Sequence, residues 1–241
     1  MCRMPAAAMV RRLVLPLTAP VGSVRAVRLD RDLAVLTYDD GPQPGGTDKV
    51  LAALAEARTT ATFFILVGRA RKHRGLLQEV VAAGHEIALH GIDHVRLTTM
   101  SAGDVRRRTK DGKHSLEDLA GQQVRWFRPP YGAQRPGTWA AVRSAGLMPV
   151  VWSNDVADWQ DDTVDVISSR ARSVRVGSVL LLHDGYADSF DGVSDGPAPG
   201  FDRGELCRRI LGELGERGVA TASLGEALVG GSAVRGAWFR R

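Results

Sequence analysis

Two short stretches of the chain carry residues whose types and spacing suit metal chemistry. The stretch HGIDH places His90 and His94 four residues apart, a spacing that brings both imidazoles onto one face of a helical turn and suits metal ligands. The stretch LTYDDGP places Asp39 and Asp40 between an apolar run and a Gly-Pro turn. Either aspartate can supply a third ligand, and two histidines with one carboxylate leave positions open for water at a catalytic Zn²⁺ or similar ion. Two histidines at this spacing also occur without a metal, so the third ligand makes the prediction more specific.

The two adjacent aspartates raise the question of why like charges stand together at the end of an apolar run. Neighbouring side chains on extended chain point in opposite directions. Asp39 and Asp40 can therefore divide the work, with one carboxylate binding a metal and the other accepting a proton from water. The alternatives are a solvated surface pair and a cap for a helix that begins near Thr47.

Three further segments hold polar residues suited to catalysis. In RPPYG, residues 128–132, the prolines fix a turn that can present a backbone N–H to an oxyanion, and Arg128 can hold a carboxylate in a bidentate pair; the alternative is a plain connection. In DVADWQ, Asp155 and Asp158 flank a turn before Trp159, a residue suited to stacking on sugars or to filling a core. In VLLLHDG, His183 ends an apolar run and is either a general acid or a core histidine.

The pattern of apolar runs predicts an α/β fold that brings these residues together. The expected strands are Leu33–Tyr38, Ala61–Leu66, Glu86–His90, Arg125–Arg128, Met148–Trp152, Ser178–His183 and Val219–Ala222. The expected helices are Asp48–Ala57, Leu76–Ala83, Ser101–Leu119, Thr138–Ala145, Val164–Ser173 and Arg203–Arg217. Strand and helix in alternation predict a parallel sheet covered by helices. The polar residues follow strand ends, where such folds place their chemistry. The Asp- and Gly-rich stretch 184–200 is expected to be a loop at the mouth of that site.

Composition limits the remaining possibilities. The chain has 241 residues, 44% hydrophobic and 24% charged, which suits a single globular domain. Its formal net charge is +5, but the arginines are scattered and no nucleic-acid motif is present, so a nucleic-acid partner is not expected. Cys2 and Cys207 imply no disulfide framework.

Both ends of the chain are expected to lie outside the main domain. Residues 1–30 are expected to be a loosely ordered extension, 31–230 the domain, and 231–241 a tail. No stretch has the roughly 20 apolar residues of a membrane span, and the prolines after Arg12 interrupt the only stretch that resembles a signal peptide. A cytoplasmic monomer is therefore favoured, with secretion or envelope association as the alternative.

Taken together, the motifs resemble those of the polysaccharide deacetylases with a NodB-homology domain, carbohydrate esterase family four. In order along the chain they are TYDDGP, HGIDH, RPPYG, DVADW and LLLHD, with TATFFI and AAGHEIALH between them, and the similarity runs from Leu33 to Leu228. The resemblance implies a distorted (β/α) barrel of about seven parallel strands. It also implies a metal-dependent hydrolase that removes acetyl groups from N-acetylated sugars, with Zn²⁺ expected and Co²⁺ or another divalent ion as the alternative.

The resemblance also implies a role for each site residue. The implied roles are Asp39 as catalytic base, Asp40, His90 and His94 as metal ligands, Tyr131 as the backbone donor to the oxyanion, Arg128 as the partner of an acidic residue, His183 as the acid tuned by Asp158, and Pro130, Trp159, Leu180 and Leu182 as the lining of the acetyl and sugar pocket.

Several features depart from the family pattern or leave alternatives open. Gly91 stands where Ser or Thr is usual, Tyr38 where Phe is usual, and the 184–200 loop is atypical. O-acetyl ester hydrolysis is the alternative chemistry. A non-catalytic carbohydrate-binding relative would be expected to lack the base or a ligand, and a basic protein that binds anionic polymer would show salt-sensitive binding without a metal requirement.

Overall fold

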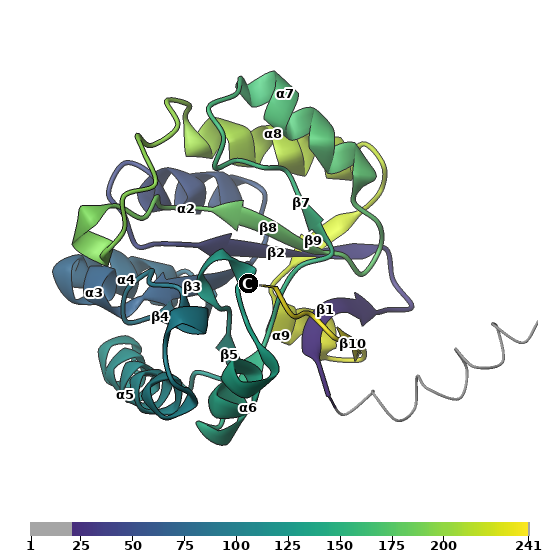
Figure 1. Cartoon of the computed structure of the whole chain (residues 1–241). Coiled ribbons are helices and arrows are strands. Elements are labelled where there is room, and N and C mark those ends of the chain that lie inside the picture. The colour runs from purple at the N-terminus through teal and green to yellow at the C-terminus, as the bar shows by residue number, and fades with distance from the viewer. Residues whose placement is uncertain (1–20, 241) are drawn as a thin grey trace, which may run out of the picture.

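A parallel sheet forms the centre of the molecule in the computed structural model, which describes residues 21–240 (Figure 1). Its strands are β2 (Leu33–Asp39), β3 (Thr62–Leu66), β4 (Glu86–Gly91), β5 (Trp126–Phe127), β6 (Met148–Pro149), β7 (Asn154–Asp155), β8 (Val179–His183) and β9 (Ala220–Ala222). The strand order is β6-β5-β4-β3-β2-β8-β7, and β9 pairs with the first half of β2. The fold is thus a distorted (β/α) barrel in a single domain, as predicted.

Helices surround the outer side of this sheet, as Figure 1 shows for α2, α3, α5, α7 and α8. The α-helices are α2 (Thr47–Glu56), α3 (Val67–Lys72), α4 (Arg74–Ala82), α5 (Ala102–Ala120), α6 (Pro136–Ser144), α7 (Val164–Ser169), α8 (Arg203–Gly215) and α9 (Leu224–Leu228). Short 3₁₀ turns are η1 (Leu97–Thr99), η2 (Pro130–Gly132), η3 (Arg170–Ser173) and η4 (Ser189–Asp191). The longest helix, α5, begins where the Ser101 hydroxyl accepts the Asp104 N–H at 3.1 Å, and it ends at Gly121 in the left-handed conformation, as helix ends favour.

The sheet separates two apolar layers because side chains alternate along its strands. Leu36 and Tyr38 of β2 pack on the helix side, while Val35 and Phe64 pack inside the barrel. The Tyr38 hydroxyl donates to the Cys207 sulfur at 3.1 Å, which satisfies the polar atom that a Phe would lack. The parallel register places the ends of neighbouring strands together, with Asp39 opposite His183.

A second, two-stranded sheet joins the two ends of the described chain. Here β1 (Ser23–Arg28) pairs antiparallel with β10 (Ser232–Gly236). Residues 23–28 therefore do not belong to a loosely ordered extension, and residues 232–236 are more than a tail. The physical reason is burial, since Val24 and Val27 fill the barrel-side apolar layer. Residues 1–20, which make up most of the expected extension, and residue 241 lie outside the described residues.

All seven predicted strands and all six predicted helices are present, with small shifts at their ends. The sequence did not predict α3, α9, β1, β7 or β10. The segments of α3, α9 and β7 are too short to show an apolar period, and arginines interrupt the apolar residues of β1 and β10. Among residues 21–240, no helix combines the length and the apolar character needed to cross a membrane.

Candidate active site

The turn after β2 brings both aspartates into one cavity. Asp39 is the last residue of β2, and Asp40 has a positive φ of 75°, a conformation that Asp tolerates better than most residues. The expectation that the two side chains point in opposite directions is therefore wrong, because the backbone turns between them and both line the same cavity. They nevertheless have different partners, so a division of labour still follows from the geometry.

Gly41 and Asp184 hold this turn in place. The Asp184 carboxylate accepts the Gly41 N–H at 3.2 Å and the Thr47 hydroxyl at 2.5 Å. A Cβ on Gly41 would lie 2.0 Å from Asp184 Oδ2, so only glycine fits. Burial raises the pKa of Asp184 to about 7, although the Thr47 hydroxyl and the Arg203 charge oppose it. The sequence did not predict this buried carboxyl, which directly follows His183.

Asp40, His90 and His94 converge as a candidate metal site. One ligand atom from each lies within 4.8 Å of the other two, with Asp40 Oδ1 at 3.3 Å from His90 Nε2 and 3.4 Å from His94 Nε2. His90 Nδ1 lies 2.9 Å from the Arg128 carbonyl oxygen and donates to it, so Nε2 of neutral His90 presents a lone pair to the carboxylate. Asp40 Oδ1 is buried without a hydrogen-bond partner among the described residues. Lone pairs that face each other in a buried site fit a cation between them.

The protonation states suit ligation. Burial lowers the pKa of His94, and the charges of His90 and His183 add to that effect against the opposing charge of Asp40. Burial alone would raise the pKa of Asp40, but the charges of His94 and His90 outweigh it and hold that pKa well below its usual range. A divalent cation that replaced these imidazole protons would meet an ionised carboxylate and neutral imidazoles, the ligand forms that Zn²⁺ requires.

The His90 and His94 pair does not sit on a helical turn as expected. His90 is the second-last residue of β4, and the strand ends at Gly91, which has φ of 154°. A Cβ at Gly91 would lie 2.5 Å from the Asp93 carbonyl oxygen, so this tight bend requires glycine. The bend returns His94 to the site, and the His94 N–H donates to the Asp191 carbonyl at 3.0 Å.

Arg128 pairs with Asp39 behind the cavity. The Arg128 side chain is fully buried, and its Nη1 donates to Asp39 Oδ1 at 2.7 Å and to the Thr37 hydroxyl at 2.9 Å. The expected bidentate pair is therefore not formed, since one nitrogen divides its contacts between two acceptors. Phe64 lies under the guanidinium at 4.0 Å. Because Arg128 engages Oδ1, Oδ2 of Asp39 remains on the side of His90, 3.8 Å from its Nε2.

His183 and Asp158 form the opposite side of the site. His183 Nδ1 donates to Asp158 Oδ1 at 2.7 Å, and its backbone N–H donates to Oδ2 at 2.8 Å. Burial disfavours the imidazolium, but the charges of Asp158, Asp40 and Asp39 and the Asp158 hydrogen bond outweigh it and raise the pKa of His183 to about 9. Arg203 of α8, which the sequence did not single out, donates to the His183 carbonyl at 2.7 Å and lies 3.5 Å from Asp158. Protonated His183 can therefore act as a general acid.

These groups border a cavity of about 480 Å³. Its lining includes Asp39, Asp40, His90, His94, Tyr131, Trp159, Leu181 and His183. Trp159 is 39% exposed, and its ring stands edge-on to His183 at 5.9 Å, so it is available for stacking on a sugar rather than for core packing.

Three predicted pocket residues do not line this cavity. Leu180 and Leu182 are buried in the helix-side core, while Leu181 lines the cavity. The reason is alternation, because Leu181 shares the face of His183 and its neighbours do not. Pro130 is buried, and Tyr131 and Gly132 provide the cavity surface at that turn.

The 184–200 loop is more firmly held than its composition predicted. Arg69 of α3 makes a buried ion pair with Asp191, with Nη2–Oδ2 at 2.6 Å and Nε–Oδ2 at 2.9 Å. Tyr186, Ala187 and Asp195 line the cavity, and Asp195 accepts the Tyr131 hydroxyl at 2.5 Å. The loop thus reaches the mouth of the site as expected, but it is anchored by buried carboxylates.

Comparisons with known proteins agree with this site. A family model described as polysaccharide deacetylase matches residues 26–150. A chitooligosaccharide deacetylase from Sinorhizobium fredii is 38% identical over 152 residues, which cover 62% of this chain and 71% of the relative. A peptidoglycan-N-acetylglucosamine deacetylase from Bacillus cereus is 29% identical over 199 residues, which cover 81% of this chain and 88% of the relative.

Solved structures share the fold. A CE4 family pseudoenzyme from Bacillus anthracis superposes with a TM-score of 0.72 at 22% sequence identity, covering 83% of this chain and 66% of that chain. At this sequence identity the likeness shows the fold alone. Because one fold can serve different functions, the function has to be argued from the residues of the site.

The open parallel barrel gathers an Asp-His-His cluster at the carboxyl ends of its strands, which is where folds of this class place their active sites. The chain belongs to the polysaccharide deacetylase family, carbohydrate esterase family four with a NodB-homology domain. It is therefore an enzyme of the class that hydrolyses carbon–nitrogen bonds other than peptide bonds.

Proposed function

We propose that the protein is a divalent-metal-dependent deacetylase that removes the N-acetyl group from N-acetylglucosamine residues of oligosaccharides or polysaccharides, with Zn²⁺ as its metal. The observation that carries the proposal is the convergence of Asp40, His90 and His94 between the Asp39–Arg128 and His183–Asp158 pairs. Relatives named for chitooligosaccharide and for peptidoglycan N-acetylglucosamine support the sugar.

In the proposed mechanism, Asp39 is the general base. Its Oδ1 is held by Arg128 at 2.7 Å, so the carboxylate is fixed, and Oδ2 is free to take the proton of the attacking water. A divalent cation held by Asp40, His90 and His94 would polarise the acetamide carbonyl and lower the pKa of water. The backbone N–H of Tyr131, in a turn with φ of 59°, would donate to the oxyanion that develops on the carbonyl oxygen.

The acid step belongs to His183. The departing amine needs a proton, and the Asp158 pair keeps the imidazole protonated and directs Nε2 away from Asp158. Trp159, at 5.9 Å from the His183 ring, would stack on the sugar that carries the acetamide and place it between acid and base. The presence of both Asp39 and His183 argues against a non-catalytic carbohydrate-binding relative.

The decisive experiment measures acetate release from a panel of acetylated carbohydrates. Purified protein is stripped with chelator, and then assayed with and without added Zn²⁺ or Co²⁺ on N-acetylated chito-oligomers and on O-acetylated xylan. We expect metal-restored release from the chito-oligomers. Release from xylan alone would replace the proposal with O-acetyl ester hydrolysis, and chelator-insensitive release would overturn the metal requirement.

A further inference from the structure

The segment that follows β10 forms part of the wall of the catalytic cavity. Arg240 lines the cavity, and its backbone exchanges hydrogen bonds with Gln134 at 3.0 and 3.1 Å. The Trp238 indole donates to the Gly132 carbonyl at 3.0 Å and packs edge-on against Trp152 with ring centroids 5.1 Å apart. These contacts fix the segment beside the Tyr131 turn. The proposed mechanism assigns no role to this segment.

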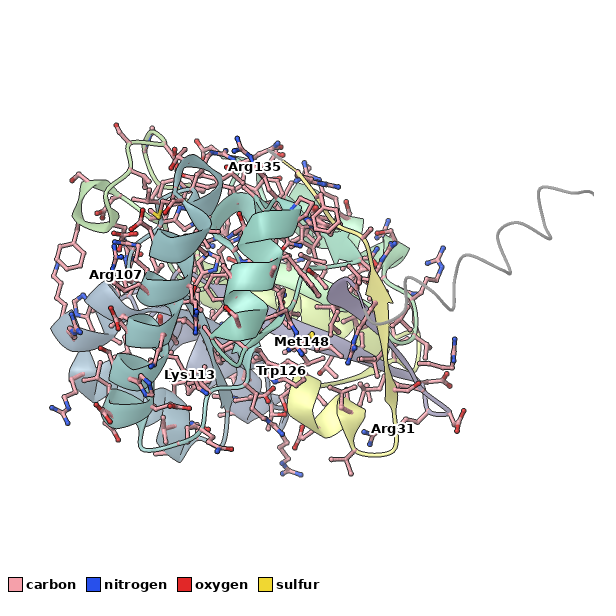
Figure 2. All side chains as sticks on the ribbon, turned by 60° about the horizontal axis from the view of Figure 1, so that its bottom comes forward. Arg31, Arg107, Lys113, Trp126, Arg135 and Met148 are labelled. Atoms are coloured by element: carbon pink, nitrogen blue, oxygen red, sulfur yellow. The ribbon has the colours of Figure 1, made fainter. Side chains whose placement is uncertain are left out.

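A second hollow of about 540 Å³ adjoins the catalytic cavity across Arg240. It is lined by Gln134, Arg135, Pro136, Phe239 and Arg240, and Arg240 belongs to both lining sets. In Figure 2, Arg135 is labelled at the start of α6, where the yellow C-terminal segment passes. A chain of linked sugars that enters the first cavity can therefore continue over Arg240 into this hollow.

The charges of the two hollows differ. The catalytic cavity has four aspartates in its lining, Asp39, Asp40, Asp155 and Asp195, beside Arg96 and Arg240. The lining of the second hollow contains two arginines and no carboxylate. Within residues 21–240, neither Arg135 nor Arg240 forms an ion pair, that is, no carboxylate oxygen lies within 4.0 Å of either guanidinium. The Arg240 guanidinium instead lies 3.9 Å above the Trp238 ring, which holds it in one place while its edge N–H groups stay available.

Phe239 supplies an apolar surface in the same hollow. It is 40% exposed, and an exposed aromatic ring beside hydrogen-bonding groups suits the face of a sugar. Two guanidinium groups with planar sets of donors suit a carboxylate or a phosphate.

We propose that this hollow is a subsite for the sugar next to the one that is deacetylated, and that Arg135 and Arg240 select a neighbour that carries an anionic group, either a carboxylate or a phosphate. The proposal rests on the proposed function and deepens it, because it names a class of substrate. The preferred substrate is then an acidic glycan rather than a neutral N-acetylglucosamine polymer.

The test compares three tetrasaccharides of equal length that differ in charge. One is neutral N-acetylglucosamine tetramer, one alternates N-acetylglucosamine with a sugar that carries a carboxylate, and one is a phosphorylated N-acetylglucosamine tetramer. Arg240→Gln and Arg135→Gln are each expected to raise the ratio of KM for the preferred acidic tetrasaccharide to KM for the neutral tetramer by up to about fivefold, the upper end for one exposed charge pair. Higher salt should raise KM for the acidic substrate and leave KM for the neutral tetramer unaffected. Arg235→Gln, an exposed arginine on β10, is the matched control.

The outcomes separate the subsite from the proposed function. Binding of the three tetrasaccharides to Asp39→Asn protein, measured by calorimetry, does not depend on turnover. If wild-type protein releases no acetate but Asp39→Asn protein still binds an acidic tetrasaccharide through Arg240, the deacetylase proposal fails and the subsite stands. If the arginine variants raise KM equally for neutral and acidic substrates, or raise it for neither, the anionic subsite is refuted.

Discussion

Replacing Asp158 by Asn tests how the site keeps its acid protonated. The pKa of His183 is raised to about 9, against an ordinary value near 6.5, and one pKa unit corresponds to about 1.4 kcal/mol. The surroundings therefore favour the imidazolium by roughly 3 kcal/mol. Asp158 is the nearest cause, since its carboxylate accepts the Nδ1 proton at 2.7 Å. Without its charge, burial is expected to lower the pKa to about 6.5 or below.

The expected effect on activity follows from the sign of this change. An acid works only while protonated, so activity falls as pH rises through the pKa of His183. In Asp158→Asn this basic limb should move to lower pH, because the Asp158 charge and hydrogen bond that raise the pKa of His183 are lost, and acetate release at pH 7.5 should fall by about tenfold or more. Near pH 5.5 the variant should approach wild-type turnover.

Two measurements check this prediction. NMR titration of the His183 ring in metal-free protein reports its pKa directly, and acetate release from pH 5 to pH 10 reports the limb in the loaded enzyme. Asp155→Asn is the control, because Asp155 lines the same cavity but accepts the Trp152 indole N–H at 3.1 Å instead. A His183 pKa that stays near 9 in Asp158→Asn would refute the reasoning.

The same shift predicts a pH dependence of stability. Because the folded pKa of about 9 exceeds the unfolded value near 6.5, this contribution is complete below pH 6.5 and is lost as pH rises to 9. Wild-type metal-free protein should lose up to roughly 3 kcal/mol of unfolding free energy across that window. Urea unfolding of wild-type and Asp158→Asn protein at pH 6 and pH 9 measures this loss of unfolding free energy. An equal loss in both proteins would contradict the prediction.

Three further predictions concern neighbouring residues. Asp39→Asn should keep its zinc and lose turnover by about 10²–10⁴-fold, whereas Asp40→Asn should bind zinc more weakly; metal analysis with the opposite pattern would exchange their roles. Gly41→Ala would place a Cβ 2.0 Å from Asp184 Oδ2 and should lower the free energy of unfolding by about 1–3 kcal/mol, as measured by urea unfolding. Gly137→Ala is the control, because Gly137 has open space around it and its replacement should not destabilise the protein. Equal urea midpoints for the two variants would contradict the packing argument. Arg69→Met leaves Asp191 buried without its partner and should destabilise by about 3–5 kcal/mol, so an unchanged urea midpoint would show that the pair contributes nothing.

The sequence predicted the fold well because apolar runs and strand-end polar residues are local signals. It predicted that Asp39, His90, Arg128 and His183 would gather at one rim, since parallel strands end on the same side. Alternation from His183 could also have placed Leu181 rather than Leu180 and Leu182 in the cavity. That error came from the family resemblance and not from any lack of signal.

Other features depended on long-range contacts or on backbone angles that a single sequence does not display. The turn at Asp40, with φ of 75°, reverses the direction that extended chain predicts. Asp184 and Arg203 act through partners far away in the chain, Thr47 and Asp158. The buried Asp191 looks like a loop residue until Arg69 is placed beside it.

The pairing of β1 with β10 also has a consequence for the order in which the molecule matures. It joins segments that are about 200 residues apart in the chain, and contacts of such sequence separation form late because loop closure must precede them. Arg240 follows β10 by only four residues. A chain that has assembled the parallel sheet but not this last pairing would hold Asp39, Asp40 and His183 in place without the part of the cavity wall that Arg240 forms. On the proposed function and subsite, such a molecule would release acetate before it could discriminate among glycans. Across variants, the rate of hydrogen exchange of the β1 amides is therefore expected to correlate with substrate preference and not with turnover.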